Sequence, residues 1–382
     1  MTNNGPLPLL GNLTPAAFLK EYWQKKPLLI KNAIAGFTGL LSAEELAGLA
    51  CEDEVQSRIV QQKAGQWSLK DGPFDEQDFS KLPKKDWTLL VQSVNHYLPE
   101  AGELLQQFDF IPHVRLDDLM VSYAPDGGGV GPHFDSYDVF LLQGQGKRLW
   151  RVSEQSDLSL MDGAPLRILK DFKTEQEWLL EAGDMLYLPP HVAHWGLAVG
   201  DDCMTYSIGF RAPKHQELAS EFLGFMQDKL AQEKLVLTGI YQDGDLKPTN
   251  HPAEISPDMV RKVGEILNKI QWSDNDVAAF LGQYLSEPKP DVVFEDNKKI
   301  SLKVFSEKLA KLGIALALKS QMLFAGEVFY LNGEAASFDA EAREILMNLA
   351  DRRRIAPYTT QDIGLLQQLY DWYISGYLYF EG

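Results

Sequence analysis

The tripeptide His133-Phe134-Asp135, together with the more distant His194, supplies the side-chain types of a 2-His-1-carboxylate metal site. Such a site binds a ferrous ion through three ligands and leaves further coordination positions open. Residues i and i+2 of a strand point to the same face, so His133 and Asp135 can reach one metal together. Because His-x-Asp also occurs by chance in unrelated chains, the surrounding sequence must support the assignment.

Three histidines compete for the role of the distant ligand. His191 directly follows Pro189-Pro190, and His194 comes shortly after it. His113 lies upstream of the strand-rich region and is the weakest of the three. Considered alone, the residues allow either His191 or His194 as the third ligand, and they favour His194 only slightly.

The carboxylate ligand has one rival. Asp138 lies close to Asp135 in the sequence, but strand alternation puts its side chain on the face opposite to His133. The segment 127–131, just before the ligands, is rich in glycine. A strand and not a helix is expected to follow, so these glycines are no dinucleotide fingerprint. We expect them to let the backbone turn tightly into the ligand segment.

An oxygen-activating ferrous site needs a co-substrate beside the metal, and an arginine suits its far carboxylate because the two groups pair through two hydrogen bonds. Arg148 lies in a strand-like run after a predicted turn at 144–146. Strand alternation divides this run into two faces, Arg148-Trp150-Val152 and Lys147-Leu149-Arg151. Only one of the two faces can point into a barrel, and the sequence leaves open which.

The composition is that of a soluble globular protein. With 382 residues the chain is expected to form two or three domains, and 45% hydrophobic and 24% charged residues are ordinary values. We see no signal peptide, no apolar run long enough to cross a bilayer, and two cysteines without a metal-type spacing. We therefore expect a cytoplasmic protein. Its net charge of −18 argues against nucleic acid and anionic membranes. An acidic surface would favour a basic partner, but from this number alone a role in solubility is the better explanation.

Short strand-like runs separated by turns fill the region 119–210. The runs are 120–123, 139–142, 148–152, 185–188 and 205–210. This pattern predicts a jelly-roll barrel, whose open mouth can hold a metal and a small acid. Upstream, Thr14-Pro15 and Ser42 with Glu45 predict two helix starts, and we expect a further helix over 87–97.

After residue 212 the pattern becomes helical. Apolar residues at helical spacing predict helices over 217–235, 259–270 and 277–285. A linker rich in proline and charge follows at 288–291. Helices outside a small barrel often form a dimer interface, which we keep as a hypothesis.

The last part of the chain combines helices with a hairpin signal. Asn332-Gly333 predicts a two-residue β-hairpin turn, and helices around a hairpin can form a winged-helix module. Residues 301–382 carry 8 Lys and Arg and 10 Asp and Glu, a charge balance that does not favour binding of nucleic acid.

Several longer motifs surround the candidate ligands. They are Gly129–His133 with Asp135, Tyr137–Phe140, Gly146–Trp150, Gly183–Pro190 up to His194, Tyr206–Arg211 and, near the N-terminus, Glu21–Leu28. These motifs closely resemble the JmjC-type cupins called ribosomal oxygenases, in particular the bacterial branch that hydroxylates an arginine of ribosomal protein uL16. The resemblance extends in outline over nearly the whole chain. It is specific around the metal and loose at the C-terminus.

The resemblance implies an α+β architecture in three parts. A JmjC/cupin double-stranded β-helix barrel forms the catalytic domain over 1–212, with N-terminal helical and strand elements. A helical dimerisation region over 213–287 and a winged-helix-like domain over 291–382 follow. A homodimer is therefore expected.

The resemblance also implies the site. Fe(II) is held by His133, Asp135 and His194, which resolves His194 over His191. The co-substrate 2-oxoglutarate chelates the iron and places its far carboxylate on Arg148. Molecular oxygen then takes the remaining position, and 2-oxoglutarate is decarboxylated to succinate.

Three further residues receive roles around these groups. Ser207 is expected to assist 2-oxoglutarate. An arginine substrate, hydroxylated at C3, needs an acidic partner at the mouth of the barrel, for which Asp126 is the candidate. Tyr137 is a weaker substrate contact. The segment around Asp126 can equally be a plain turn.

Other functions remain open. The same chemistry would serve a hydroxylase of histidine or another side chain. It would also serve a lysine demethylase, since hydroxylation of an N-methyl carbon releases formaldehyde. A non-catalytic JmjC-like regulator that binds nucleic acid through the C-terminal domain is opposed by the complete ligand set and by the acidic balance of that domain.

Overall fold

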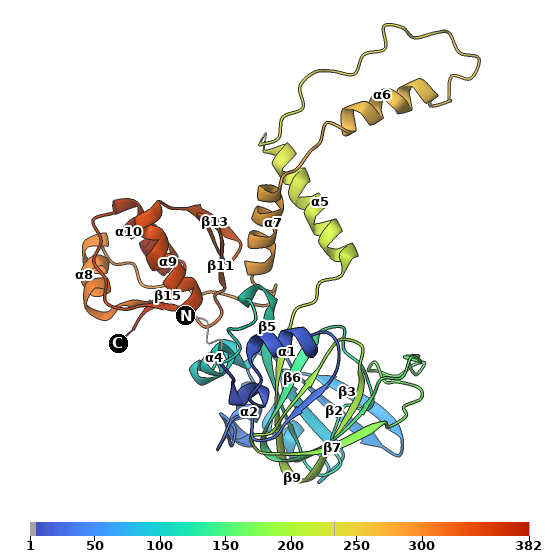
Figure 1. Ribbon diagram of the computed structural model, residues 1–382, viewed down its shortest axis with the longest axis vertical. Helices are drawn as coiled ribbons and strands as arrows, with labels where there is room; N and C mark the ends of the chain where they lie inside the picture. Colours follow the sequence, from blue (N-terminus) through green and yellow to red (C-terminus); the bar gives the residue numbers. More distant parts are fainter. Residues whose placement is uncertain (1–4, 233, 382) are drawn as a thin grey trace.

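The structure is a computed structural model that describes residues 5–232 and 234–381. It consists of a β-rich body that ends at Phe210, a helical arm, and a C-terminal domain of helices and short strands (Figure 1). The arm leaves the body and returns to it, so that the C-terminal domain lies beside the body.

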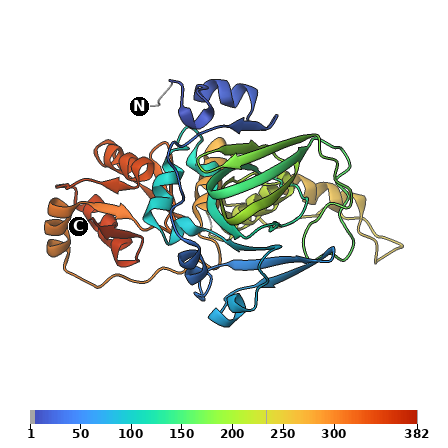
Figure 2. The same ribbon diagram turned by 90° about the horizontal axis from the view of Figure 1, so that it is seen from below.

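Among the described residues, nine strands form the sheet of the body. They are β1 (Leu28–Ile30), β2 (Ser57–Lys63), β3 (Gln66–Asp71), β4 (Trp87–Val91), β5 (Leu116–Ala124), β6 (Asp138–Ser153), β7 (Gln176–Glu181), β8 (Met185–Leu188) and β9 (Ala193–Phe210). Their order is β1-β8-β6-β9-β5-β4-β2-β3, with β7 paired to β6. The strands curve around a common interior (Figure 2), and the predicted barrel is confirmed.

The turn predicted at 144–146 is wrong. β6 continues as one strand from Asp138 to Ser153, and its register against β9 shifts between Gln143 and Lys147. The extra residues form bulges, which bend a strand without ending it. Glycine is needed there, because a Cβ on Gly144 would lie 2.4 Å from the Tyr206 ring. Arg148 therefore belongs to the same strand that begins just after the ligand Asp135.

The helix predicted over 87–97 is also wrong. This segment forms β4, which pairs with both β2 and β5, followed by the 3-10 turn η2 (Val94–His96). Leu89 and Val91 point from β4 into a buried core. Periodicity cannot distinguish a short buried strand from a helix, and here pairing with two neighbouring strands decides the conformation.

Both predicted helix starts are confirmed. Thr14 caps α1 (Pro15–Glu21) by accepting the Ala17 N–H, and Ser42 forms a capping box with Glu45 at the start of α2 (Ala43–Leu49). The body also contains η1 (Pro8–Leu10), α3 (Glu76–Ser80), α4 (Pro99–Gln106) and η3 (His113–Arg115). Among these elements α1, α2 and α4 pack on the outer face of the sheet.

The two faces of the sheet bury different side chains. The outer face packs an aromatic core that includes Phe140, Tyr187 and Phe210. The alternate residues of the same strands line the barrel interior, for example Leu141 and Leu188. On β6 and β9, alternation along the strand therefore decides whether a side chain packs in the outer core or lines the barrel interior.

The helical arm comprises α5 (His215–Ala231), α6 (Pro257–Leu267) and α7 (Asp274–Ser286). α6 lies far from the body in Figure 1, and none of its residues is buried. Its apolar residues lie on one side of the helix, and Met259, Val260 and Leu267 among them are exposed. Within residues 5–232 and 234–381, no helix combines the length and apolarity required to cross a bilayer.

The C-terminal domain has its own core, which includes Phe305, Phe329 and Trp372. Its elements are α8 (Leu302–Leu312), β10 (Ile314–Leu316), β11 (Met322–Ala325), β12 (Val328–Leu331), β13 (Glu334–Ser337), α9 (Ala340–Arg352), β14 (Arg354–Ile355), α10 (Ile363–Ile374) and β15 (Leu378–Phe380). The predicted hairpin is confirmed: Asn332 and Gly333 join β12 to β13 with φ values of +51° and +87°.

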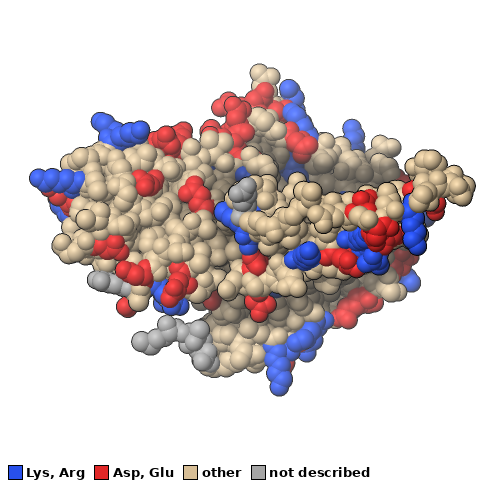
Figure 3. Space-filling model, turned by 90° about the horizontal axis from the view of Figure 1, so that it is seen from above, with Lys and Arg blue, Asp and Glu red and all other residues tan. Residues whose placement is uncertain are grey.

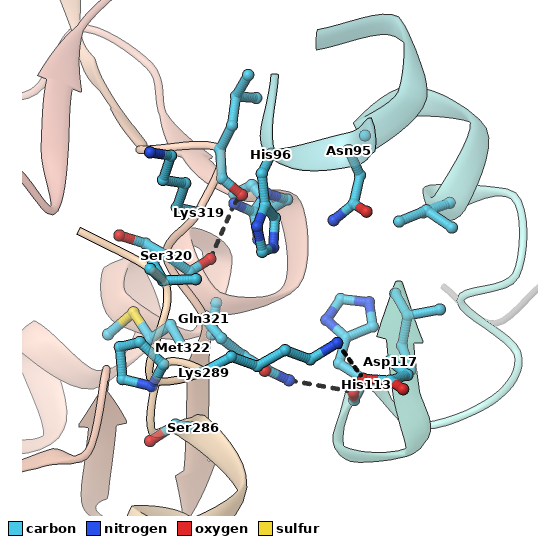
Figure 4. A pocket seen from close by; sticks show the side chains of 18 of the residues that line it. Asn95, His96, His113, Asp117, Ser286, Lys289, Lys319, Ser320, Gln321 and Met322 are labelled. Atoms are coloured by element: carbon cyan, nitrogen blue, oxygen red, sulfur yellow. Dashed lines mark hydrogen bonds and ion pairs between the residues drawn. The ribbon is translucent and has the colours of Figure 1, made fainter. Parts of the chain in front are cut away.

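Polar contacts join the C-terminal domain to the body around a cavity of about 100 Å³ (Figure 4). Lys289 Nζ lies 3.1 Å from the carboxylate of Asp117. Gln321 Nε2 donates to the carbonyl of His113 at 3.4 Å. The linker and the C-terminal domain are thereby held against η3 and the start of β5.

Asp138, the rival carboxylate, has a structural role. Its side chain is fully buried at 0% exposure and accepts hydrogen bonds from Tyr187 Oη at 2.6 Å and Gln24 Nε2 at 3.1 Å. Arg115 Nη2 lies 3.3 Å away and neutralises the charge. The side chain therefore joins the N-terminal segment to the barrel from the outer side of the sheet.

We expect Asp138→Ala to lower the free energy of unfolding by about 3 kcal/mol, because three groups lose their acceptor inside the protein. Urea denaturation followed by circular dichroism measures this loss. The exposed Asp162 provides the control, since Asp162→Ala should change stability by less than about 0.5 kcal/mol. Equal stability of the two variants would contradict this role of Asp138.

Candidate metal centre

The side chains of His133, Asp135 and His194 come together in the structure. One potential ligand atom from each lies within 4.8 Å of the other two, and no second group of three such side chains occurs in the described part of the chain. His194 Nε2 is 3.6 Å from Oδ2 of Asp135, and the two imidazole centroids are 4.2 Å apart. Ligands that each lie about 2 Å from an ion are roughly 3 to 4 Å apart, so the cluster has the size of a single metal site.

Backbone pairing brings these distant residues together. The His133 N–H donates to the carbonyl of His194 at 2.9 Å, and the His194 N–H donates to His133 at 2.8 Å. The bridge is isolated, and neither His133 nor Asp135 lies in a regular strand. The strand expected for these two residues is thus reduced to one bridge, which aligns the ligand segment with the first residues of β9.

The glycines before His133 allow this close pairing. A Cβ on Gly129 would lie 2.4 Å from the carbonyl oxygen of Gly196, and one on Gly128 would lie 2.1 Å from the carbonyl oxygen of Trp87. Gly131 has a φ of +80°, which disfavours any other residue. The glycine-rich segment is therefore needed for backbone approach.

Both histidines are held in the same tautomer. Nδ1 of His133 lies 2.9 Å from the carbonyl of Gly131, and Nδ1 of His194 lies 2.9 Å from that of Val192. A carbonyl only accepts, so each Nδ1 carries the proton and each Nε2 keeps its lone pair for a metal. Burial, reinforced by the neighbouring His133, lowers the pKa of His194 to about 4. His194 is therefore neutral at physiological pH.

The rival histidines do not join the cluster. The side chain of His191 is exposed and lies near the Phe134 ring, with centroids 5.9 Å apart. Its backbone N–H nevertheless donates to the carbonyl of Asp135 at 2.7 Å, so His191 supports the ligand segment through its main chain. His113 instead pairs with Asp109 at 2.8 Å.

Arg148 is a buried cation that forms no ion pair with any described residue. Its side chain is on the inward face of β6 and the residue is only 4% exposed, while Nε and Nη2 find no hydrogen-bond partner among the described residues. The next basic residue of the strand, Arg151, lies on the outer face and pairs with Glu177 at 2.9 Å. An unpaired guanidinium inside a protein is costly, so this site is suited to an anionic ligand that supplies the missing acceptors.

The three remaining predicted residues lie in different environments. Ser207 is 8% exposed and lies in β9, where it faces the barrel interior by alternation. Asp126 is exposed, and its Oδ1 accepts the Gly200 N–H at 2.9 Å, which anchors the turn before the glycines. Tyr137 follows the ligand segment. Desolvation of its phenol and the nearby carboxylate of Asp135 raise its pKa, so the hydroxyl stays protonated.

Trp150 lies in the interior, and no role was predicted for it from the sequence. Trp150 is 6% exposed and its indole Nε1 has no partner among the described residues. The alternation that groups Trp150 with Arg148 was visible in the sequence. The orientation of that face, inward and not outward, depends on the closure of the barrel.

Protein-family models match two parts of this chain. A JmjC domain model matches residues 103–218, and a ROXA-like winged-helix model matches residues 269–379. The chain is 35% identical over 377 residues to the ribosomal protein uL16 3-hydroxylase of Escherichia coli, covering 96% of this chain and 97% of the relative.

Solved structures give the same result. The X-ray structure of E. coli YcfD superposes with a TM-score of 0.85 at 34% identity, covering 97% of this chain and 98% of that chain. YcfD in complex with cobalt and 2-oxoglutarate superposes with a TM-score of 0.82 at 33% identity, covering 97% and 99% of the two chains. This chain belongs to the family of JmjC-type ribosomal oxygenases.

Proposed function

We propose that this protein is an Fe(II)- and 2-oxoglutarate-dependent oxygenase that hydroxylates C3 of an arginine side chain in ribosomal protein uL16. The observation that carries the proposal is the combination of one metal-sized His-Asp-His cluster with an unpaired buried arginine in the same barrel. The likeness over nearly the full length to a uL16 3-hydroxylase supports the substrate.

In this proposal His133, Asp135 and His194 hold the iron. Their two imidazoles and one carboxylate form a 2-His-1-carboxylate set that leaves positions free for 2-oxoglutarate and O2. The bound metal supplies oxygen activation: one oxygen atom ends in the substrate hydroxyl and the other in the succinate formed by decarboxylation of 2-oxoglutarate. The carbonyls of Gly131 and Val192 fix the tautomers, and burial keeps His194 unprotonated at Nε2.

Arg148 binds the far carboxylate of 2-oxoglutarate, with Ser207 as a further donor. Two guanidinium nitrogens without partners match the two oxygens of a carboxylate. The surrounding side chains of the interior, including Leu141 and Val152, are apolar and buried, so water competes little for this pair. Binding of 2-oxoglutarate thus neutralises a charge that the fold leaves unpaired.

Asp126 and Tyr137 contact the substrate arginine at the mouth of the barrel. Asp126 is held through Oδ1 by Gly200, which fixes its carboxylate while the residue remains exposed to a guanidinium. The protonated Tyr137 offers both a donor and an acceptor. The net charge of −18 favours encounter with a basic ribosomal protein.

The same geometry would serve a histidine hydroxylase or a lysine demethylase, and analysis of the product separates these activities. Nucleic-acid binding is not part of the proposal. The face shown in Figure 3 carries basic and acidic side chains side by side, without a continuous basic surface. We place the protein in the cytoplasm, where ribosomal proteins are made, and keep the unit boundaries 1–212, 213–287 and 291–382.

We further propose a homodimer formed through the arm. Ile255, Val260 and Leu267 are 73%, 60% and 57% exposed on and beside α6. Such a group of apolar side chains, held away from the body, is more typical of an interface than of a free surface.

We expect Arg148→Ala to lower kcat/KM for 2-oxoglutarate about 100-fold, because the carboxylate loses charge-assisted hydrogen bonds in a desolvated site. Succinate release and mass spectrometry of recombinant uL16 measure turnover and locate the added oxygen. The matched control is Arg151→Ala on the outer face of the same strand, which should retain activity. If a residue other than arginine is oxidised, or if formaldehyde is released, the proposed hydroxylation of arginine is wrong.

We expect His194→Ala to abolish tight Co(II) binding under anaerobic conditions, since two ligands cannot replace three. The absorption of bound Co(II) provides the readout. His191→Gly is the matched control because glycine keeps the N–H bonded to Asp135 and suits a φ of +66°. If His194→Ala bound Co(II) like the wild type while His191→Gly did not, the ligand assignment would be wrong.

We expect Val260→Asp combined with Leu267→Asp to convert the dimer to a monomer, because charges replace apolar contacts in the interface. Light scattering after size-exclusion chromatography gives the mass. Ile363→Asp is the control, since Ile363 is 73% exposed on α10, outside the arm. If the wild-type protein is already a monomer, the proposed homodimer is wrong.

A further inference from the structure

Trp150 presents an unused hydrogen-bond donor inside the barrel. The residue is 6% exposed, and its Nε1 has no partner among the described residues. An indole N–H can only donate, so its partner must be an acceptor. A buried donor without an acceptor lowers stability, and native proteins rarely keep one that a ligand or a water molecule does not satisfy.

The position of Trp150 links the metal cluster to Arg148. The centroid of its ring lies 5.8 Å from that of His194 and 5.8 Å from Cζ of Arg148. Trp150 and Arg148 are alternate residues of β6 and project into the same interior. The indole therefore lies next to both the ligand His194 and Arg148.

The opposite strand determines which edge of the indole is free. Trp150 pairs with Gly196 in β9, and a Cβ there would lie 2.7 Å from Cζ3 and from Cη2 of the indole. Gly196 therefore leaves room for the six-membered ring, which lies against the backbone of β9. Nε1 lies on the five-membered ring of the indole, outside this contact, and has no partner among the described residues.

A second tryptophan provides a comparison within the same pair of strands. Trp195 also has a buried Nε1 without a partner among the described residues. It lies on the outer face, however, with its ring 5.3 Å from Cζ of Arg151 and 6.2 Å from the ring of Phe172. The two indoles thus differ in the side of the sheet that they occupy.

We propose that the Trp150 N–H donates a hydrogen bond to an oxygen of 2-oxoglutarate and that the indole sets the distance between the metal and the carboxylate bound by Arg148. The proposal rests on the proposed roles of His194 and Arg148. Nε and Nη2 of Arg148 and Nε1 of Trp150 are three unpaired donors in one wall of the barrel, and a dicarboxylate with a keto group offers acceptors along its whole length. Trp150 is thereby a binding residue for the co-substrate.

The test is Trp150→Phe, which keeps an aromatic ring and removes the donor. Isothermal titration of 2-oxoglutarate into the full-length, Co(II)-loaded protein should give about tenfold weaker binding, the effect of losing one hydrogen bond to a charged group. Co(II) affinity should be unchanged. Trp195→Phe, the matched control, should bind 2-oxoglutarate like the wild type.

A second measurement uses the unaltered protein. In ¹H–¹⁵N spectra of the Zn(II)-loaded wild type, the indole resonance that Trp150→Phe removes should shift when 2-oxoglutarate is added, and the Trp195 resonance should stay in place. Unchanged affinity of Trp150→Phe, an unshifted resonance, or an equal loss in Trp195→Phe would overturn the proposal. Absence of 2-oxoglutarate binding by the wild type would instead refute the proposed function itself.

Discussion

The backbone bridge between His133 and His194 is the interaction on which the candidate centre depends. Its two hydrogen bonds, of 2.9 and 2.8 Å, align the ligand segment with the start of β9. Metal ligands must be positioned within fractions of an ångström, and side chains on separate loops would not achieve this alone. The glycines at 128 and 129 make the bridge possible, because any larger residue would collide with neighbouring carbonyl oxygens.

The interior of the barrel contains a buried charge that lowers stability and suits the binding of an anion. Arg148 carries a charge in a space otherwise lined by apolar side chains, and its Nε and Nη2 have no hydrogen-bond partner among the described residues. Burial of such a charge is unfavourable, and an anionic ligand reverses the penalty. By contrast, the fully buried Asp138 is satisfied by Tyr187, Gln24 and Arg115, which is the pattern of a structural charge.

Strand alternation made part of the site predictable from the sequence. It grouped Arg148 with Trp150 and Val152. The exclusion of Asp138 was correct for another reason: His133 and Asp135 lie outside regular strands, and the Asp138 side chain is held on the outer face by Tyr187 and Gln24. Helix starts at Thr14 and Ser42 and the hairpin at Asn332-Gly333 were also predictable, because caps and tight turns depend on neighbouring residues only. The predicted helix over 87–97 failed because β4 is stabilised by pairing with β2 and β5, which are distant in the sequence.

The sequence by itself determined the ligand types and the resemblance to ribosomal oxygenases. The resemblance also chose His194 over His191, and the structure brings His194 to His133 and Asp135. Only the tertiary structure decided which face of β6 points inward and that residues 144–146 form bulges instead of a turn. The physical reason is the range of the interactions. Alternation and capping act within a few residues, whereas closure of the barrel and pairing of β9 with the ligand segment join residues far apart in the chain.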